Sequence, residues 1–419
     1  MTNPAEIPRY GADASLALLR KGYAFIPDTC DRLGSDAFRT RIMGRDVICM
    51  RGPAAAALAY GGPVTRVGAM PGFVLRLLQG KGSVQQLNGD AHRHRKAMFI
   101  ALAADPARVK ALIADFHAAW DAALPRWQDG GRIVLLDELA RVLTEAACRW
   151  SGITLAPEAM GQLAGDLAAM VDNAGRLGPR NWLAQLRRTR AERLMQSVIA
   201  AARSSADTGT PLHMIAHHRD LQGDLLSVAV AAIEMLNILR PIVAIGRYIA
   251  FAAAQMHREP SWCALFRTGA DGAERLLDDF VEELRRLSPF FPFVGAVTTG
   301  PVTWRGHDIP AGQWLLCDLY GTTHDARYFP DPHRLMPARM LSWRDDGFTF
   351  IPQGAGDMAS THRCPGEMVT VAVMKAAVMR LCAVDYDMPA QDLGVRLNQI
   401  PARPASGVIL ANLRARADD

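Results

Sequence analysis

The chain has 419 residues, half of them apolar, and a formal net charge of +5. A chain of this length can bury a large core, and so mild a charge gives no reason to expect a nucleic-acid-binding protein. Seven scattered cysteines without a CxxC pair exclude a zinc ribbon and indicate a reducing compartment without a disulfide framework. The N-terminus has no charged-then-apolar signal pattern, so we expect a cytoplasmic protein.

Residues 13–62 mix short helical and strand-like signals. DASLALLRKG has the apolar spacing of a short helix, whereas YAFIP and RDVICMRG are strand-like runs bounded by turn residues. PAAAALAY begins with proline, which the first turn of a helix tolerates. This pattern predicts a small β-rich lobe beside a helical body.

The stretch from residue 65 to residue 99 carries the first candidate binding residues. Asp90 can cap a helix that begins at Ala91, and His92 and Lys96 would then share one helix face. Two donors at this spacing could hold a pair of carboxylates, although a solvated basic helix start gives the same pattern. His92 and His94 could instead form an HxH metal site, but no third ligand lies nearby in the sequence.

Three apolar patterns with a period of 3.6 residues predict a run of helices from residue 105 to residue 210. The segment RLGPRNWLAQLRRTRAERL collects six arginines, but it lacks the interleaved aromatics of a nucleic-acid site. We interpret it as a solvated helix face that could also steer anions. His213 and His217 are four residues apart and could bind a metal on a helix, but a surface or packing role is favoured because no acidic ligand accompanies them.

Residues 224–256 form the longest apolar stretch and are long enough to span a membrane. Glu234, Arg240, Pro241 and Arg247 interrupt it, so we expect a buried helix in a protein without a membrane span. Pro241 removes one backbone hydrogen bond and should kink the helix at this point.

A buried Arg240 requires an anionic partner, because an unpaired buried charge costs several kcal/mol. Glu234 could serve, but it lies six residues away and points to a different face of the helix. The better interpretation is a guanidinium that grips a ligand carboxylate with two parallel hydrogen bonds.

Between Phe348 and Lys375 a loop rich in glycine and proline leads through Cys364 into an apolar pattern of helical length. Unpaired backbone N–H groups at such a helix start would lower the pKa of the thiol and suit it to bind a metal. The residues PQGAG and HRCPGE, with the long loop between Gly354 and Cys364, resemble the haem-binding loop of cytochrome P450 enzymes. This loop is as long as that of the fatty acid peroxygenase branch, which the chain therefore resembles more narrowly. The resemblance extends over essentially the whole chain.

The resemblance implies a single domain, 1–419, that is mainly α with a small β-rich lobe. It implies haem b (iron protoporphyrin IX) held through the axial thiolate of Cys364. The other cofactor-binding positions that it implies are Arg66, His92, Lys96 and His362.

Most cytochromes P450 carry an acid–alcohol pair in the long central helix, and here Arg240 and Pro241 replace it, as in the peroxygenases. The substrate carboxylate bound by Arg240 would then be the acid–base group that activates hydrogen peroxide. Gln85 matches the position above the haem, where family members with Gln lean towards hydroxylation and those with His towards decarboxylation. Gln79 departs from the large apolar residue that usually faces the substrate.

Two overlapping Glu-x-x-Arg matches lie about 80 residues before Cys364, and alignment with the family favours Glu283 and Arg286 over Glu282 and Arg285 as its buried ion pair. Residues 337–340, PARM, replace the usual Pro-Glu-Arg-Phe, so we expect a weaker arginine network there.

The sequence therefore predicts a peroxygenase that hydroxylates free fatty acids at C2 or C3 with hydrogen peroxide and decarboxylates some of them to terminal alkenes. Arg240 and Gln85 are the expected catalytic residues, and Arg240, Pro241 and Gln79 are the expected substrate contacts. The protein is expected to be a monomer that needs no redox partner. A reductase-dependent monooxygenase acting on a carboxylic acid and a non-catalytic haem or fatty acid binding protein are the alternatives.

Overall fold

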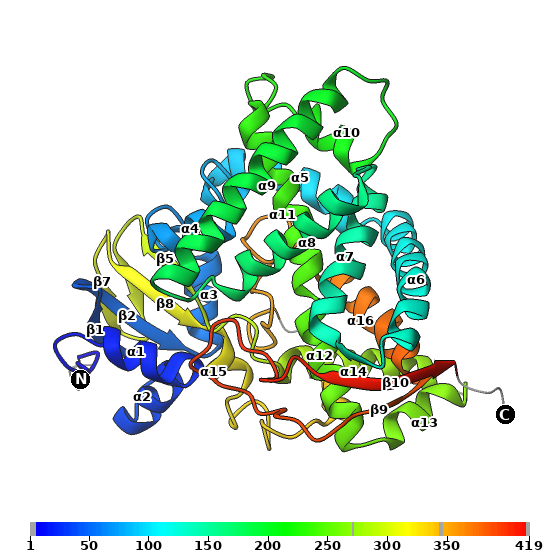
Figure 1. Ribbon diagram of the computed structural model, residues 1–419. Helices are drawn as coiled ribbons and strands as arrows, with labels where there is room; N and C mark the ends of the chain where they lie inside the picture. The colour runs from blue at the N-terminus through cyan, green and yellow to red at the C-terminus, as the bar shows by residue number, and fades with distance from the viewer. Residues whose placement is uncertain (1–5, 270–271, 343–346, 416–419) are drawn as a thin grey trace.

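The computed structural model describes residues 6–269, 272–342 and 347–415. A helical body and a smaller β lobe lie side by side (Figure 1). The lobe contains a five-stranded sheet in the order β1-β2-β8-β5-β3, in which only the β2–β8 pair is parallel. Its strands are β1 (Ala37–Ile42), β2 (Arg45–Arg51), β3 (Val64–Thr65), β5 (Phe293–Thr298) and β8 (Trp314–Asp318). The expectation of a mainly α chain with a small β-rich lobe is confirmed.

Short helices pack around this sheet, and one of them corrects the sequence-based prediction. The lobe helices are α1 (Ser15–Lys21), α2 (Phe25–Leu33), α3 (Pro53–Gly61) and α15 (Leu319–Thr323). The segment YAFIP, predicted as a strand, forms a 3₁₀ turn and the start of α2. Phe25 and Ile26 are buried against sheet residues such as Val47 and Trp314, so this apolar run packs onto the sheet instead of pairing with it.

The helical body surrounds one large hydrophobic core. Asp105 accepts a hydrogen bond from the backbone N–H of Arg108 at 2.9 Å, and Pro106 opens the first helix of the run predicted from residue 105. The helices of the body are α4 (Gly72–Leu78), α5 (Gly89–Ala103), α6 (Pro106–Asp129), α7 (Leu135–Ser151), α8 (Pro157–Asp172), α9 (Pro179–Arg203), α10 (Pro211–Ala216), α11 (Val228–Ala244), α12 (Gly246–Arg258), α13 (Ser261–Arg267), α14 (Ala273–Leu287) and α16 (Glu367–Cys382).

Small strands complete the structure at its edges. The C-terminal tail forms β9 (Val384–Asp387) and β10 (Ile409–Ala415), which pair with β4 (Arg132–Val134) in the order β4-β10-β9. A separate hairpin joins β6 (Val302–Trp304) to β7 (His307–Ile309). Residues 1–5, at the N-terminus considered for a signal pattern, and residues 416–419 lie outside the described residues.

The long apolar stretch forms the centre of the body. By length and composition, residues Val228–Arg258 could cross a membrane, but 78% of their most apolar window is buried inside the structure, as in a core helix. Pro241, where we expected a kink, lies inside α11, which continues to Ala244, and the helix is interrupted at Ile245. The N–H of Ile245 bonds to the carbonyl of Ile242 at 3.1 Å, which is a tighter turn than that of an α-helix.

Two further expectations are wrong. Asp90 does not cap the helix, because α5 begins at Gly89 with Asn88 as its N-cap, and the Asp90 carboxylate pairs with Arg93 instead. A disulfide joins Cys263 to Cys382, which are 119 residues apart, although we expected no cysteine pairing. The packing of α13 beside the end of α16 brings the two together, and spacing in the sequence cannot reveal such a contact.

Candidate active site

Cys364 lies in the turn just before α16, as the sequence predicts. Its backbone N–H donates to the carbonyl of Gln353 at 3.1 Å, and the Gln353 Nε2 lies 3.8 Å from the Cys364 Sγ. Gln353 is itself fixed, since its Nε2 donates to Thr370 at 3.1 Å and its Oε1 accepts from Arg285 at 3.0 Å. Gln353 belongs to the PQGAG motif, but the sequence gave no reason to assign it a role beside the sulfur.

The pKa of the Cys364 thiol differs from our expectation. Burial raises this pKa, and the negative charge of Glu367 acts in the same direction. The N–H of Gly366 does lower it, as predicted, but the effect of burial is larger. The thiol would therefore require a positively charged ligand to hold it as thiolate, and a metal ion is such a ligand.

Four basic side chains gather beside this turn: Arg66, His92, Lys96 and His362. The rings of His92 and His362 stack with their centroids 3.9 Å apart. Lys96 donates to the carbonyl of Arg363 at 2.6 Å and to that of Thr361. Arg66 donates to the carbonyl of Ala59 at 2.9 Å and to that of Gly295. None of the four forms an ion pair with a carboxylate in the part of the chain that the structure describes.

The pKa values of these groups show the cost of their burial. Burial and then the charges of Arg66, His92 and Lys96 lower the pKa of His362 to about 2. Burial and neighbouring cations lower that of His92 to about 4, and burial lowers that of Lys96 to about 8. Two of these donors, His92 and Lys96, are buried, and Arg66 and His362 are partly buried. Because none of them has an acidic partner among the described residues, they fit a ligand with two carboxylates, which would relieve this repulsion.

The central helix contributes a further basic side chain, Arg240, which is buried and 8% exposed. Its Nη1 donates to the Oδ1 of Asn237 at 3.4 Å, and it forms no ion pair with any described residue. Burial and the charge of Arg188 lower its pKa to about 9. Pro241 is exposed although its helical neighbours are buried, so an open space lies against this turn of α11.

Asn237 connects Arg240 to the two glutamines predicted from the sequence. Its Nδ2 donates to the backbone carbonyl of Gln79 at 3.1 Å and to the Oε1 of Gln85 at 3.4 Å. The same Nδ2 donates to Glu234 at 3.0 Å, and Glu234 pairs with Arg95 at 3.3 Å. Glu234 therefore does not pair with Arg240, which agrees with the sequence-based expectation. The sequence analysis missed Asn237, although its position three residues before Arg240 on a helix could have suggested it.

Arg188 corrects the interpretation of the arginine-rich segment as a solvated face. It is 1% exposed, pairs with Glu192 at 2.7 Å and donates to the carbonyl of Leu77 at 2.8 Å. A Cβ atom at Gly80, where φ is +84°, would lie 2.4 Å from the Arg188 Nη2. Arg188 therefore fixes the end of α4 and the turn that carries Gln79.

Glu283 and Arg286 form the deeply buried ion pair that the sequence favoured. Both side chains are 0% exposed, and both Arg286 bonds to the carboxylate measure 2.8 Å. Arg339, from the PARM segment, also pairs with Glu283 at 2.9 Å, so the expected weakening of this network is wrong. Arg285 pairs with Glu282 and Glu367 instead.

The histidine metal sites considered in the sequence do not form. His94 turns away from His92 to bond with the carbonyl of Arg219 at 2.8 Å. His213 is buried and bonds to Thr208 at 3.0 Å, with its ring stacked on that of His217. No cluster of three His, Cys, Asp or Glu side chains able to hold a metal ion occurs among the described residues.

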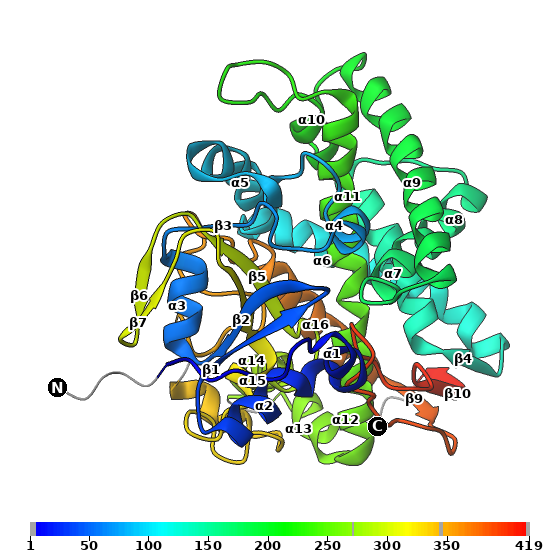
Figure 2. The same cartoon turned by 90° about the vertical axis from the view of Figure 1, so that its left-hand side faces the viewer.

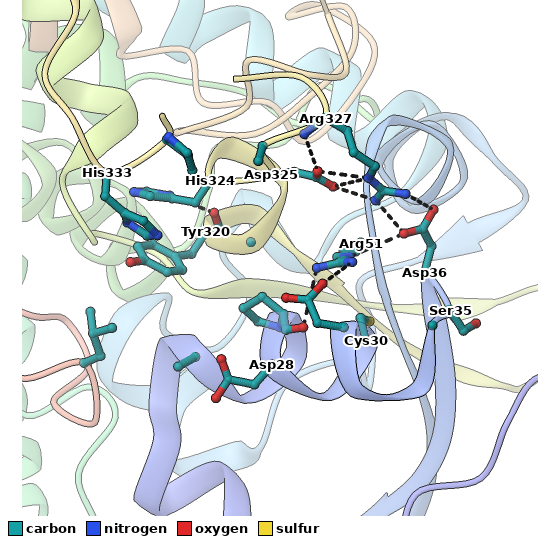
Figure 3. Close-up of a pocket in the computed structure, with 18 of the residues that line it drawn as sticks. Asp28, Cys30, Ser35, Asp36, Arg51, Tyr320, His324, Asp325, Arg327 and His333 are labelled. Carbon is teal, nitrogen blue, oxygen red and sulfur yellow. Dashed lines mark hydrogen bonds and ion pairs between the residues drawn. The ribbon is translucent and has the colours of Figure 1, made fainter. Parts of the chain in front are cut away.

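A hollow of about 1060 Å³ lies elsewhere, between α2 and the segment around His324 (Figure 3). Its charged groups satisfy one another: Asp36 pairs with Arg51, Arg305 and Arg327. Arg327 also pairs with Asp325. These contacts hold the lobe together and leave no charge for a ligand, so we do not assign the active site to this hollow.

A cysteine on a turn before a buried helix, a cluster of basic donors beside it and a helix with an open face together define a haem-thiolate protein. Comparisons with known proteins agree. The sequence model of the family described as Cytochrome P450 matches residues 275–383. Cytochrome P450 4e5, mitochondrial, of Drosophila mettleri is 28% identical over 120 residues, which cover 29% of this chain and 22% of that protein. Putative cytochrome P450 135B1 of Mycobacterium tuberculosis is 23% identical over 88% of this chain and 82% of its own length.

Solved structures are more similar. Cytochrome P450SP alpha (CYP152B1) in complex with (R)-ibuprophen is 41% identical, with a TM-score of 0.93 over 97% of this chain and 100% of that one. Cytochrome P450EX alpha (CYP152N1) with myristic acid is 34% identical, with a TM-score of 0.92 over 98% and 99% of the two chains. A variant of cytochrome P450 OleT in complex with arachidonic acid is 30% identical, with a TM-score of 0.94 over 99% and 100%. The chain belongs to the cytochrome P450 family, and its cofactor is haem with a cysteine thiolate as axial ligand.

Proposed function

We propose that this protein is a peroxygenase that uses hydrogen peroxide to hydroxylate free fatty acids at C2 or C3, with some decarboxylation to terminal alkenes. The observation that carries the proposal is the buried Arg240, whose charge no carboxylate among the described residues balances. A fatty acid carboxylate supplies the missing charge. The relatives whose structures hold myristic and arachidonic acid support a substrate of this class.

Haem, when bound, supplies the oxygen-transfer chemistry, with Cys364 as axial ligand. Arg66, His92, Lys96 and His362 would hold its two carboxylates, since they are buried or partly buried donors without acidic partners among the described residues. Arg240 holds the substrate carboxylate, which takes a proton from hydrogen peroxide and returns it to the oxygen that leaves as water. The substrate thus supplies the acid–base group that the chain lacks at this position.

Binding of the carboxylate also determines which carbon reacts. Arg240 fixes the first carbon of the chain, so only the next two carbons can lie close to the reacting oxygen. Asn237 holds Gln85 and the backbone of Gln79 near the same turn of α11. These side chains therefore shape the space around C2 and C3, and Pro241 forms part of its wall.

The direct test is to incubate the purified haem-loaded protein with a long-chain fatty acid and hydrogen peroxide alone and to analyse the products by mass spectrometry. We expect hydroxy acids and a smaller amount of alkene. Arg240→Ala should lower kcat/KM by up to about 100-fold, since a buried charge-assisted contact contributes up to about 3 kcal/mol. Arg396→Ala, at a side chain that is 72% exposed, is the matched control. Full activity of Arg240→Ala would disprove the mechanism.

The same assay separates the alternatives. Turnover with a reductase but not with peroxide would indicate a monooxygenase that depends on an electron-transfer partner. A spectral change on fatty acid binding without any product would indicate a haem or fatty acid binding protein. We further propose that the protein acts as a monomer in the cytoplasm without a redox partner.

A further inference from the structure

The N-terminal end of α9 exposes an unusual group of large apolar side chains. Leu177, Trp182, Leu183 and Leu186 are 55%, 67%, 53% and 69% exposed. Four such residues within ten positions form a contiguous apolar surface, whereas isolated exposed apolar residues are common and need no explanation. We refer to these four residues as the α9 patch.

The packing of α9 does not explain the α9 patch. Asn181, Ala184 and Arg188 recur every three to four residues and are all buried, so they form the face that contacts the body. Trp182 and Leu186 are four residues apart on the outer face. The apolar residues of the patch therefore face outward on a helix whose inner face is already occupied.

The charge around the α9 patch is positive. No Asp or Glu occurs from residue 173 to residue 191, a stretch that contains five arginines. Arg180 is exposed and, among the described residues, forms no ion pair, and the same holds for Arg193, two helical turns beyond the patch. Leucine and tryptophan bordered by unpaired arginines are typical of helices that lie in the interface of an anionic membrane.

A second group of exposed apolar residues lies on the same side of the molecule. Figure 2 shows α1, the β1–β2 hairpin, α4 and the end of α9 facing the viewer together. In α1, Leu16 and Leu19 are 56% and 50% exposed, and at the turn of the hairpin Met43 is 63% exposed. Arg20 and Lys21 end α1. Two apolar and basic groups on one side suit a broad, flat, anionic surface better than a small protein partner.

We propose that the α9 patch docks the protein peripherally onto an anionic lipid surface. Trp182, Leu183 and Leu186 enter the headgroup region, and Arg180 and Arg193 contact lipid phosphates. The chain does not span the bilayer in this arrangement. The docking does not rest on the proposed function, although a membrane surface is where long-chain fatty acids concentrate.

The test is flotation of the haem-loaded protein with vesicles, one set of phosphatidylcholine alone and one of phosphatidylcholine and phosphatidylglycerol in equal parts. We expect binding to the mixed vesicles that falls with added salt. The double variant Trp182→Ser/Leu186→Ser should lose this binding. Arg180→Gln/Arg193→Gln should weaken it about tenfold. Leu221→Ser, at a leucine that is 47% exposed outside the patch, should bind like the unaltered protein.

Three results would overturn the proposal. They are no binding to either kind of vesicle, equal binding to both, and unchanged binding of Trp182→Ser/Leu186→Ser. Sedimentation without vesicles adds a fourth: a concentration-dependent dimer that this double variant abolishes would make the patch an interface between two copies. Because these measurements do not depend on turnover, failure of the peroxygenase assay would leave their result unaffected.

Discussion

Arg188 on α9 lowers the pKa of Arg240 on α11, although the two residues are 52 positions apart in the sequence. Both guanidinium groups are buried, and Arg188 is balanced by Glu192, whereas the only described side-chain partner of Arg240 is the neutral amide of Asn237. The free protein thus keeps an uncompensated positive charge beside an open space. A carboxylate that enters this space is attracted by both arginines.

The first prediction follows from this pair. Arg188→Met should raise the Kd for a fatty acid about fivefold, because it removes a favourable interaction of about 1 kcal/mol with the carboxylate. The haem absorption change on titration with the fatty acid measures this affinity. The control is Arg190→Met, which should leave Kd unchanged. Arg190 also belongs to α9, but it is exposed and pairs with Asp166 of α8. Equal affinity of both variants would show that Arg188 only supports the α4 turn.

Gln85 provides the second prediction, which concerns the products. Gln85→His should shift the product ratio from hydroxy acids towards alkenes, because an imidazole replaces the amide that contacts Asn237 at 3.4 Å. Product separation by mass spectrometry at a fixed peroxide concentration measures the ratio. Gln86→His, whose native amide bonds to Ser83 at 3.2 Å, is the neighbouring control. A product ratio that does not change in Gln85→His would remove Gln85 from the list of residues that direct the reaction.

The third prediction compares the two overlapping Glu-x-x-Arg motifs. Glu283→Gln should lower the free energy of unfolding by about 3–5 kcal/mol, since it leaves Arg286 and Arg339 buried without a carboxylate. Glu282→Gln should cost about 1 kcal/mol or less, because Glu282 is 20% exposed and Arg285 retains Glu367 at 3.6 Å. Urea unfolding of the haem-loaded proteins measures both. If both variants lost the same free energy of unfolding, Glu283 and Arg286 would not be the structural ion pair of the motif.

Asp318 provides a prediction about pH. Burial raises the pKa of its carboxyl group to about 8, and one of its oxygens has no hydrogen-bond partner among the residues that the structure describes. Between its ordinary pKa near 4 and this value, the folded protein holds one more proton than the unfolded chain. This group therefore makes the free energy of unfolding fall as pH rises through that window.

Asp318→Asn should flatten this dependence, because the amide cannot ionise and still caps α15 through its bond with Gly321. Urea midpoints measured from pH 5 to pH 8 report the slope. Asp46→Asn, at a side chain that is 65% exposed, is the control and should keep the slope of the unaltered protein. An Asp318→Asn slope equal to that of the control would mean that Asp318 is ionised in the folded state.

Much of the site could be predicted because local sequence determines it. The turn before α16 places Cys364. The spacing of three residues on α14 allows both Glu282–Arg285 and Glu283–Arg286, and the family resemblance favoured the second pair. An arginine within an apolar helix has to be explained by a ligand or a partner, and this identified Arg240. The fold class followed from the same periodic patterns.

The rest depends on contacts between segments that are distant in the sequence. Whether Arg188 faces solvent or the core depends on how α9 packs against α4, and no periodicity within one helix determines that packing. The Cys263–Cys382 disulfide arises in the same way. The pKa of Cys364 was misjudged because the helix start was weighed without the burial of the sulfur, and burial has the larger effect.

The tight turn after α4 determines where substrate preference can be engineered. At Gly80 the backbone has φ +84°, and an added Cβ would also lie 2.7 Å from the Cγ2 of Ile233, so each side chain tested there would strain the turn. Gln79, one position earlier, has an ordinary φ of −114° and is only partly buried. A library of variants aimed at fatty acids of other chain lengths should therefore vary residue 79 freely and keep glycine at residue 80. We expect its active variants to come from substitutions at residue 79 alone.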